Sequence, residues 1–215
     1  MQIILTEYLG TLLRGLGTTA VLTVVAFVAS VAGGLVMATF RISPIPPLRV
    51  AGAVYVEIFR NVPLVSLLIV VVYGLPEINL NPGFVPGVII AMTLVGTAFA
   101  CETFRTGINA IGAGQIEAAR SIGLTFGGIV RELILPQATR TVIGPTVTLF
   151  IGIMLSSSLA TVVGVRDLTG TVSYINNREA LGITTFLVAA VLYAAISLGA
   201  AAFGARMETR LRVLR

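Results

Sequence analysis

Residues 15–40 read GLGTTAVLTVVAFVASVAGGLVMATF, a run of 26 residues without a charged side chain. An α-helix rises 1.5 Å per residue, so about 20 residues cross the roughly 30 Å of hydrocarbon in a bilayer. The run is therefore long enough to span a membrane. It is also longer than the roughly 7–15 apolar residues of a signal peptide, and only Arg14 precedes it as a positive charge. We expect a retained transmembrane helix.

Three further uncharged runs, residues 78–101, 141–165 and 180–205, have a similar length. A fifth apolar segment also counts as a span, although it contains Glu57 and Arg60. Charged residues make up 11 % of the chain, against about 25 % in an average soluble domain. The sequence predicts an all-α membrane protein, a single transmembrane domain over residues 1–215, with five spans at about 15–40, 50–75, 83–104, 137–160 and 181–205.

The distribution of arginine predicts the orientation of these spans. Ten of the 14 arginines fall on one side of a five-span chain, three fall on the other, and Arg60 lies inside a span. The positive-inside rule places the rich side in the cytoplasm, with the N-terminus outside and the C-terminus cytoplasmic. Topology thus accounts for the pI of about 10.1 without a nucleic-acid partner. The ten are Arg41, Arg49, Arg105, Arg120, Arg131, Arg140, Arg206, Arg210, Arg212 and Arg215.

Missing residue types exclude most kinds of catalytic site. The chain contains no histidine and no lysine, which rules out a phosphate-binding loop of the G-x-x-x-x-G-K-[ST] type and a Ser-His-Asp triad. Cys101 is the single cysteine, and we interpret it as a small buried hydrophobic residue. We expect no catalytic residue, no cofactor and no metal site in this chain.

A polar segment, QIEAARSIGLTFGGIVRELILP at residues 115–136, separates two of the predicted spans. We call it the polar island. It begins with good helix formers, and Gly123 followed by apolar Leu124 is typical of a helix C-terminus. Thr125 is placed to cap a second helix that reaches the end of the island. A first helix of about two turns is unstable alone, so it needs a packing partner.

The spacing within the island resembles a known signature. Residues 117–119 (EAA), Gly123 and residues 133–136 (LILP) are similar to the E-A-A…G…I-x-L-P motif of ABC importer permease subunits, with Leu133 where isoleucine is usual. The motif lies in the predicted cytoplasmic loop, about residues 106–136, before the penultimate span.

Two other segments resemble permeases for polar amino acids of the histidine, glutamine and glutamate type. YVEIFRNVPL at residues 55–64 is similar to Y-V-E-L-F-R-G-T-P-L, and SSLATVVGV at residues 157–165 is similar to S-S-L-A-S-V-I-G-V. The resemblance covers about residues 15–212. It favours amino acids over sugars, metals or phosphate as the transported solute.

The resemblance implies a plasma-membrane complex in a bacterium. In such a complex this chain pairs with a second permease, docks on two cytoplasmic ATPase subunits that bind ATP and Mg²⁺, and receives an amino acid from an extracytoplasmic solute-binding protein. The first helix of the island would lie in a groove of the ATPase. The alternative is that the island only connects two spans. The implied coupling residues are Glu117, Ala118, Ala119, Arg120, Gly123 and Pro136.

Glu57 and Arg60 are expected to be the only charges inside a span, and their i,i+3 spacing lets them neutralise one another. One interpretation places the pair near the cytoplasmic interface, in a structural role. The other places Arg60 near the solute path, with Asn61 and Pro63 marking a helix break.

In the amino acid subfamily a Lys-Asp pair commonly precedes the S-S-L segment, where Leu155 and Ser156 stand here. Hydroxyl groups alone cannot balance the charges of an amino acid, so we expect a non-identical second permease to carry the main solute contacts. The alternative is a homodimer without a transmembrane solute site. Glutamate or glutamine is the favoured substrate, followed by a basic amino acid. The predicted path residues are Arg60, Asn61, Ser156, Ser157, Ser158 and Thr161.

Two other functions fit the sequence less well. A secondary transporter or channel should show coupling-ion carboxylates in its spans and an internal repeat, and neither is visible in the sequence. A membrane scaffold without transport activity leaves the polar island unexplained.

Overall fold

The computed structural model describes residues 6–211, so Arg212 and Arg215 of the predicted cytoplasmic tail lie outside the described residues. Within residues 6–211 the chain is helical and contains no strand. The α-helices are α2 (Leu9–Ile42), α3 (Pro46–Asn61), α4 (Leu64–Ile69), α5 (Leu75–Glu77), α6 (Phe84–Asn109), α7 (Ala113–Ser121), α8 (Phe126–Ile129), α9 (Leu135–Ser156), α10 (Leu168–Glu179) and α11 (Ile183–Leu211). Two π-helices, η1 (Val70–Gly74) and η2 (Val130–Ile134), and a 3-10 helix, η3 (Ser157–Val163), complete the elements.

The structure agrees with the predicted all-α membrane fold, and one of the predicted spans is broken. Among the described residues, four helical stretches are long and apolar enough to cross a membrane, and α3 with α4–α5 makes a fifth if the bent pair counts as one span. The pair turns by 101° between Asn61 and Leu64. Val62 is extended and Pro63 has no N–H to continue the helix, so the predicted break at Asn61 and Pro63 is confirmed.

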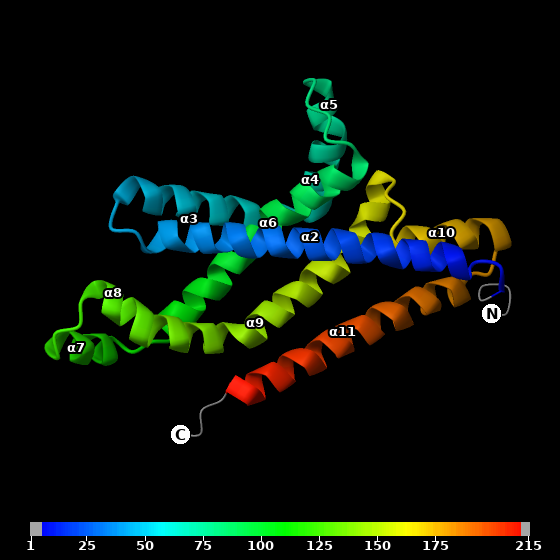
Figure 1. Ribbon diagram of the computed structural model, residues 1–215. Coiled ribbons are helices and arrows are strands. Elements are labelled where there is room, and N and C mark those ends of the chain that lie inside the picture. The colour runs from blue at the N-terminus through cyan, green and yellow to red at the C-terminus, as the bar shows by residue number, and fades with distance from the viewer. Residues whose placement is uncertain (1–5, 212–215) are drawn as a thin grey trace.

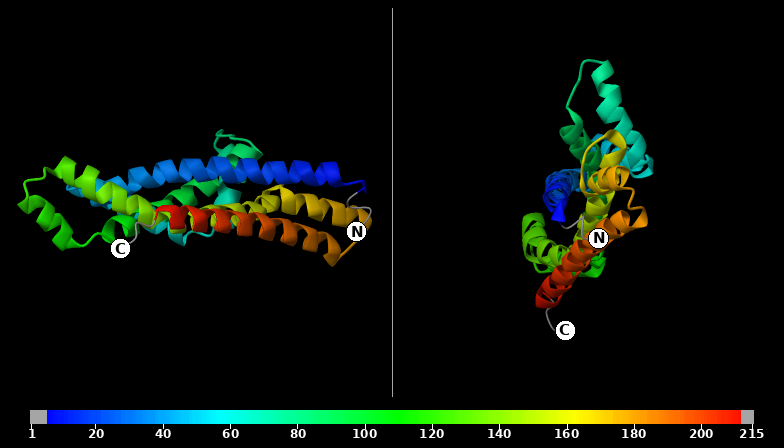
Figure 2. Two further views of the ribbon diagram at one scale, coloured as in Figure 1. Left: turned by 60° about the horizontal axis from the view of Figure 1, so that its bottom comes forward. Right: turned by 90° about the vertical axis from the view of Figure 1, so that its right-hand side faces the viewer.

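The 34-residue helix α2 runs through the length of the molecule, and helices α3, α6, α9 and α10 pack against it (Figure 1). α6 and α9 each run obliquely across α2 (Figure 1), and α11 lies beside α9, as the turned views also show (Figure 2). α7 and α8 lie at one end of the molecule and α10 lies at the other, next to the start of α2 (Figure 1). We call these the α7 end and the α10 end.

Small residues allow α2 and α6 to approach closely. A β-carbon added at Gly34 would lie 2.4 Å from the β-carbon of Ala100, and one added at Gly96 would lie 2.2 Å from the hydroxyl of Ser30. Side chains at these positions would force the helices apart, as expected where transmembrane helices pack through small residues. The central core beside this contact consists of Leu22, Ala26, Leu68, Val71, Val72, Val88, Ala91, Met92, Ile153, Ala160, Val163 and Val165.

Helix α10 was not predicted from the sequence. It contains Arg178 and Glu179 and lies between the predicted spans 137–160 and 181–205, in a stretch to which the sequence pattern assigns no element. The carboxylate of Asp167 caps its first turn by accepting from the N–H of Gly170, at 2.8 Å. One face of α10 is buried against α2 and α11, which stabilises a helix that is too polar to be a span.

Candidate functional site

The first helix of the polar island, α7, ends as predicted. Gly123 has a φ of +86°, the left-handed conformation that glycine adopts without strain. Its N–H donates to the carbonyl of Arg120 at 2.9 Å, and the N–H of Leu124 donates to the carbonyl of Ala119 at 3.1 Å. These two bonds form a complete Schellman motif. The helix end is therefore closed, and the direction of the following chain is fixed.

The second helix of the island differs from the prediction. Thr125 caps it, because its hydroxyl accepts from the N–H of Gly128 at 3.3 Å. However, α8 is only one turn long and continues into the π-helix η2 before α9 starts. Pro136 occupies the first turn of α9, where its missing N–H costs no helical hydrogen bond. The second half of the island therefore joins the next span without a loop.

α7 carries an exposed surface at its C-terminal end. Ile122 is 79 % exposed, although it is a large aliphatic residue. Ala119 is buried against the rest of the chain, so α7 has one covered side and one open side. The exposed predicted coupling residues are Glu117, Ala118, Arg120, Gly123 and Pro136. α7 and its cap thus present a short, rigid surface that the described residues leave open.

A cavity of about 890 Å³ lies between α6 and α9. Its lining includes Phe99, Thr103, Thr106, Thr148, Gly152 and Ser156. The lining residues of α6 extend from Met92 to Thr106, toward the α7 end, and those of α9 extend from Gly144 to Ser156, its last residue. The cavity therefore runs from the junction of α9 and η3 toward the α7 end.

One of the predicted path residues, Ser156, lines this cavity. Its two neighbours bond to carbonyls of the preceding turn instead. The hydroxyl of Ser157 donates to the carbonyl of Met154 at 2.7 Å, and the hydroxyl of Ser158 donates to the carbonyl of Leu155 at 2.7 Å. Ser157 is fully buried.

The other three predicted path residues lie outside the cavity lining. The hydroxyl of Thr161 donates to the carboxylate of Asp167 at 2.7 Å. The side-chain amide of Asn61 donates to the backbone carbonyl of Glu57 at 2.7 Å. Arg60 is close to the cavity but not part of its wall, since its guanidinium lies 5.7 Å from the ring centre of Phe99.

Glu102 is the ionic centre of the site, and it is not among the predicted site residues. Its carboxylate pairs with Arg41 of α2, with Arg105 at 3.3 Å and with Arg60 of α3 at 3.9 Å. The expectation that Glu57 and Arg60 are the only charges in a span, and neutralise one another, is wrong. Glu102 follows the uncharged run 78–101 directly and lies within the predicted span 83–104, so a count of charges over that whole span would have found it.

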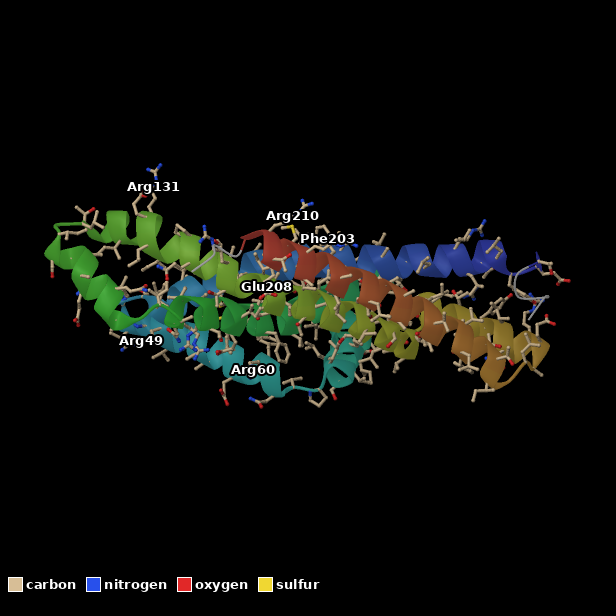
Figure 3. All side chains as sticks on the ribbon, turned by 90° about the horizontal axis from the view of Figure 1, so that it is seen from below. Arg49, Arg60, Arg131, Phe203, Glu208 and Arg210 are labelled. Atoms are coloured by element: carbon tan, nitrogen blue, oxygen red, sulfur yellow. The ribbon has the colours of Figure 1, made fainter. Side chains whose placement is uncertain are left out.

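Three helices thus share one carboxylate at the cavity wall. Glu102 is 28 % exposed, and the Arg41 and Arg105 side chains are similarly shielded. With three guanidinium groups around one carboxylate, the cluster keeps a net positive charge. Other arginines lie nearer the α7 end, including Arg49 on α3 and Arg131 on η2 (Figure 3).

Comparison with known proteins identifies relatives over nearly the whole chain. The family described as "Binding-protein-dependent transport system inner membrane component" matches residues 30–213. The "Probable glutamine ABC transporter permease protein GlnP" of Bacillus subtilis (strain 168) is 33 % identical over 207 residues, which cover 95 % of each chain. The "Glutamate transport system permease protein GluC" of Corynebacterium glutamicum is 30 % identical, over 73 % of this chain and 74 % of the relative.

A solved structure has the same arrangement of helices. It is titled "Crystal structure of an amino acid ABC transporter with histidines", with a TM-score of 0.92, 28 % identity and coverage of 97 % of both chains. The predicted fold, that of a type I ABC importer permease, is therefore confirmed.

Proposed function

Because this chain belongs to the family of binding-protein-dependent transport system inner membrane components, a multi-pass protein of the bacterial plasma membrane, we propose that it is the permease subunit of an ATP-driven amino acid importer. In this role it forms half of the translocation path. It couples this path to two cytoplasmic ATPase subunits, which bind ATP and Mg²⁺.

The open surface of α7 carries this proposal. The Schellman cap at Gly123 fixes a short helix whose Ile122 is almost fully exposed. A two-turn helix gains stability from tertiary packing rather than from its own hydrogen bonds, so its open side suits a protein partner. The ATPase subunit is that partner, and Glu117, Ala118, Arg120 and Pro136 lie at or near the contact.

The cavity between α6 and α9 is the part of the path that this subunit contributes. Its hydroxyl groups suit a polar solute, and its ionisable lining residue, Glu102, is already neutralised by arginines. Glutamine or glutamate is the proposed substrate, supported by the names of relatives at about 30 % identity.

The second permease is proposed to be a different chain. Ser156 is the one predicted path hydroxyl that faces the cavity, and Leu155 offers no charge beside it. A neutral hydrogen bond contributes only about 0.5–1.5 kcal/mol, so the charged groups of an amino acid need partners from another subunit. Robust ATP-driven uptake by this permease, its ATPase and its binding protein alone would contradict this part of the proposal.

The α10 end is proposed to face the extracytoplasmic solute-binding protein, with the N-terminus on the same side. Exposed Arg166 and Arg178 both lie against the ring of Tyr174, at 4.5 and 5.5 Å from its centre, and offer two cations to an acidic partner. Nearby, the phenol of Tyr8 donates to Glu179, and this hydrogen bond raises the pKa of Tyr8.

Reconstitution in lipid vesicles tests the function. We expect the purified complex to contain an ATPase with a phosphate-binding loop and to accumulate labelled glutamine or glutamate only with ATP and the binding protein present. Uptake that follows an ion gradient without ATP would instead identify a secondary transporter. A thermal-shift screen of the binding protein against single amino acids tests the substrate separately.

A further inference from the structure

A buried carboxylate, Asp167, lies at the start of α10. One of its oxygens accepts from the hydroxyl of Thr161 at 2.7 Å and from the N–H of Gly170 at 2.8 Å. The other accepts from the phenol of Tyr193 at 2.9 Å. A carboxylate hidden from water is costly unless donors surround it, and these three donors supply that environment.

Four elements meet at this carboxylate. Thr161 belongs to η3, Tyr193 belongs to α11, and Asp167 caps α10. Helix α2 completes the junction, because the hydroxyl of Thr19 accepts from the N–H of Leu168 at 3.0 Å. The Asp167 side chain therefore joins the beginning of α10 to the segment that follows the cavity.

That segment, η3, is an unusual element. It is a 3-10 helix of seven residues, whereas runs beyond three or four residues are uncommon and often mark a hinge. It starts directly after the cavity residue Ser156 and ends at Gly164, whose φ is +85°. η3 thus begins where the wall of the cavity ends on the side away from the α7 end. It has a change of helix type on one side and a left-handed glycine on the other.

The side-chain hydrogen bonds of η3 are of two kinds, local bonds and one bond to another element. The hydroxyls of Ser157 and Ser158 donate to carbonyls of the preceding turn, so they do not connect η3 to any other element. The hydroxyl of Thr161 reaches Asp167, across the turn at Gly164. If the Thr161–Asp167 bond breaks, Gly170 and Tyr193 still donate to the carboxylate, so the buried charge keeps two hydrogen bonds.

We propose that Asp167 is a positioning residue that, through its hydrogen bond with Thr161, fixes η3 where it follows the cavity wall, at the end of the translocation path nearer α10. Release of this bond leaves η3 held by the packing of Ala160 and Val163 in the central core, so that η3 shifts and opens the path at that end, while the bonds to Gly170 and Tyr193 keep α10 and α11 in place. The proposal rests on the permease function proposed above.

A spin label on η3 tests the proposal without solute or ATP. Val162 is 54 % exposed and next to Thr161, so Val162→Cys in a Cys101→Ala background accepts a nitroxide label with little disturbance. Three variants are compared in the assembled complex. Thr161→Val removes the hydroxyl at constant shape, Thr161→Ser retains it, and Tyr193→Phe removes one hydrogen bond from the same carboxylate without touching η3.

We expect Thr161→Val to convert the label from an immobile to a mobile spectrum, and Thr161→Ser and Tyr193→Phe to leave it immobile. Hydrolysis of ATP in the absence of the binding protein should rise several-fold in Thr161→Val alone. An immobile label in Thr161→Val, or equal mobility in Tyr193→Phe, would overturn the proposal. Failure of the wild-type complex to import an amino acid would count against the proposed function. The mobility of the label would still test the role of Asp167, because it is measured without solute or ATP.

Discussion

Arg60 of α3 and Glu102 of α6 form an ion pair, with 3.9 Å between the Nη1 and Oε1 atoms, beside the cavity between α6 and α9. The same carboxylate also pairs with Arg41 and Arg105. One acidic side chain therefore fixes α2 and α3 against α6. The bent α3–α4 segment is held to the bundle at this point.

Replacing Glu102 by glutamine should destabilise the protein. The three guanidinium groups would lose their common anion and repel one another, which we expect to cost about 1–3 kcal/mol. Thermal unfolding of the purified complex measures the change. Glu57→Gln is the matched control, because exposed Glu57 contacts Asn61 and no guanidinium group. Equal unfolding temperatures for the two variants would contradict a structural role for the Glu102 cluster.

Gly123→Leu should uncouple transport in a protein that still folds. An L-residue at a φ of +86° is strained by roughly 1–2 kcal/mol, although no atom within 4 Å would hinder the new side chain. We expect the strain to shift the end of α7 and to lower uptake per ATP hydrolysed. Gly127→Leu, which also has open space, serves as the control on α8. Wild-type uptake by correctly assembled Gly123→Leu complexes would refute the prediction.

Ile122→Asp should weaken the binding of the ATPase subunit. Full burial of an aliphatic side chain is worth about 1.5–3 kcal/mol, so loss of the apolar contact predicts a drop in affinity of about tenfold or more. Titration of purified permease with ATPase subunits measures it. Ile183→Asp changes an equally exposed isoleucine, 75 % against 79 %, at the other end of the molecule. The idea fails if both variants bind the ATPase as the wild type does.

Gly152→Leu should block the cavity. Gly152 lies in its wall, and a new β-carbon there meets no atom within 4 Å, so the leucine can extend into the open space. We expect uptake to fall at least tenfold while the unfolding temperature does not fall, since leucine favours a helix over glycine by up to about 1 kcal/mol. Gly199→Leu on α11 has the same open space away from the cavity and should transport normally. Normal uptake by Gly152→Leu would remove this cavity from the path.

The sequence predicted features that depend on local residue patterns. The left-handed Gly123, the cap at Thr125 and the break at Pro63 follow from the conformational preferences of single residues, and the structure confirms each. Uncharged runs of about 25 residues likewise identify the spans, because length and polarity are local properties.

The remaining features depend on contacts between distant segments. Glu102 meets Arg41 across 61 residues, and neither the spacing nor the composition of the chain predicts that pair. α10 is helical because Asp167 caps it and because its buried face packs on α2 and α11, not because its sequence resembles a span. Thr161 was expected to face the solute, but the carboxylate of Asp167 takes its hydroxyl.

The length of α2 links this protein to its lipid. A helix of 34 residues is about 51 Å long, well above the roughly 30 Å of the hydrocarbon core, so α2 has to tilt or project from the bilayer. Its first turns touch α10, and its last turn holds Arg41 against Glu102. A change in bilayer thickness alters the tilt of such a helix. The acyl-chain length of the lipid would therefore affect the contact of α2 with α10 and the Arg41–Glu102 pair at the same time, because one helix carries both.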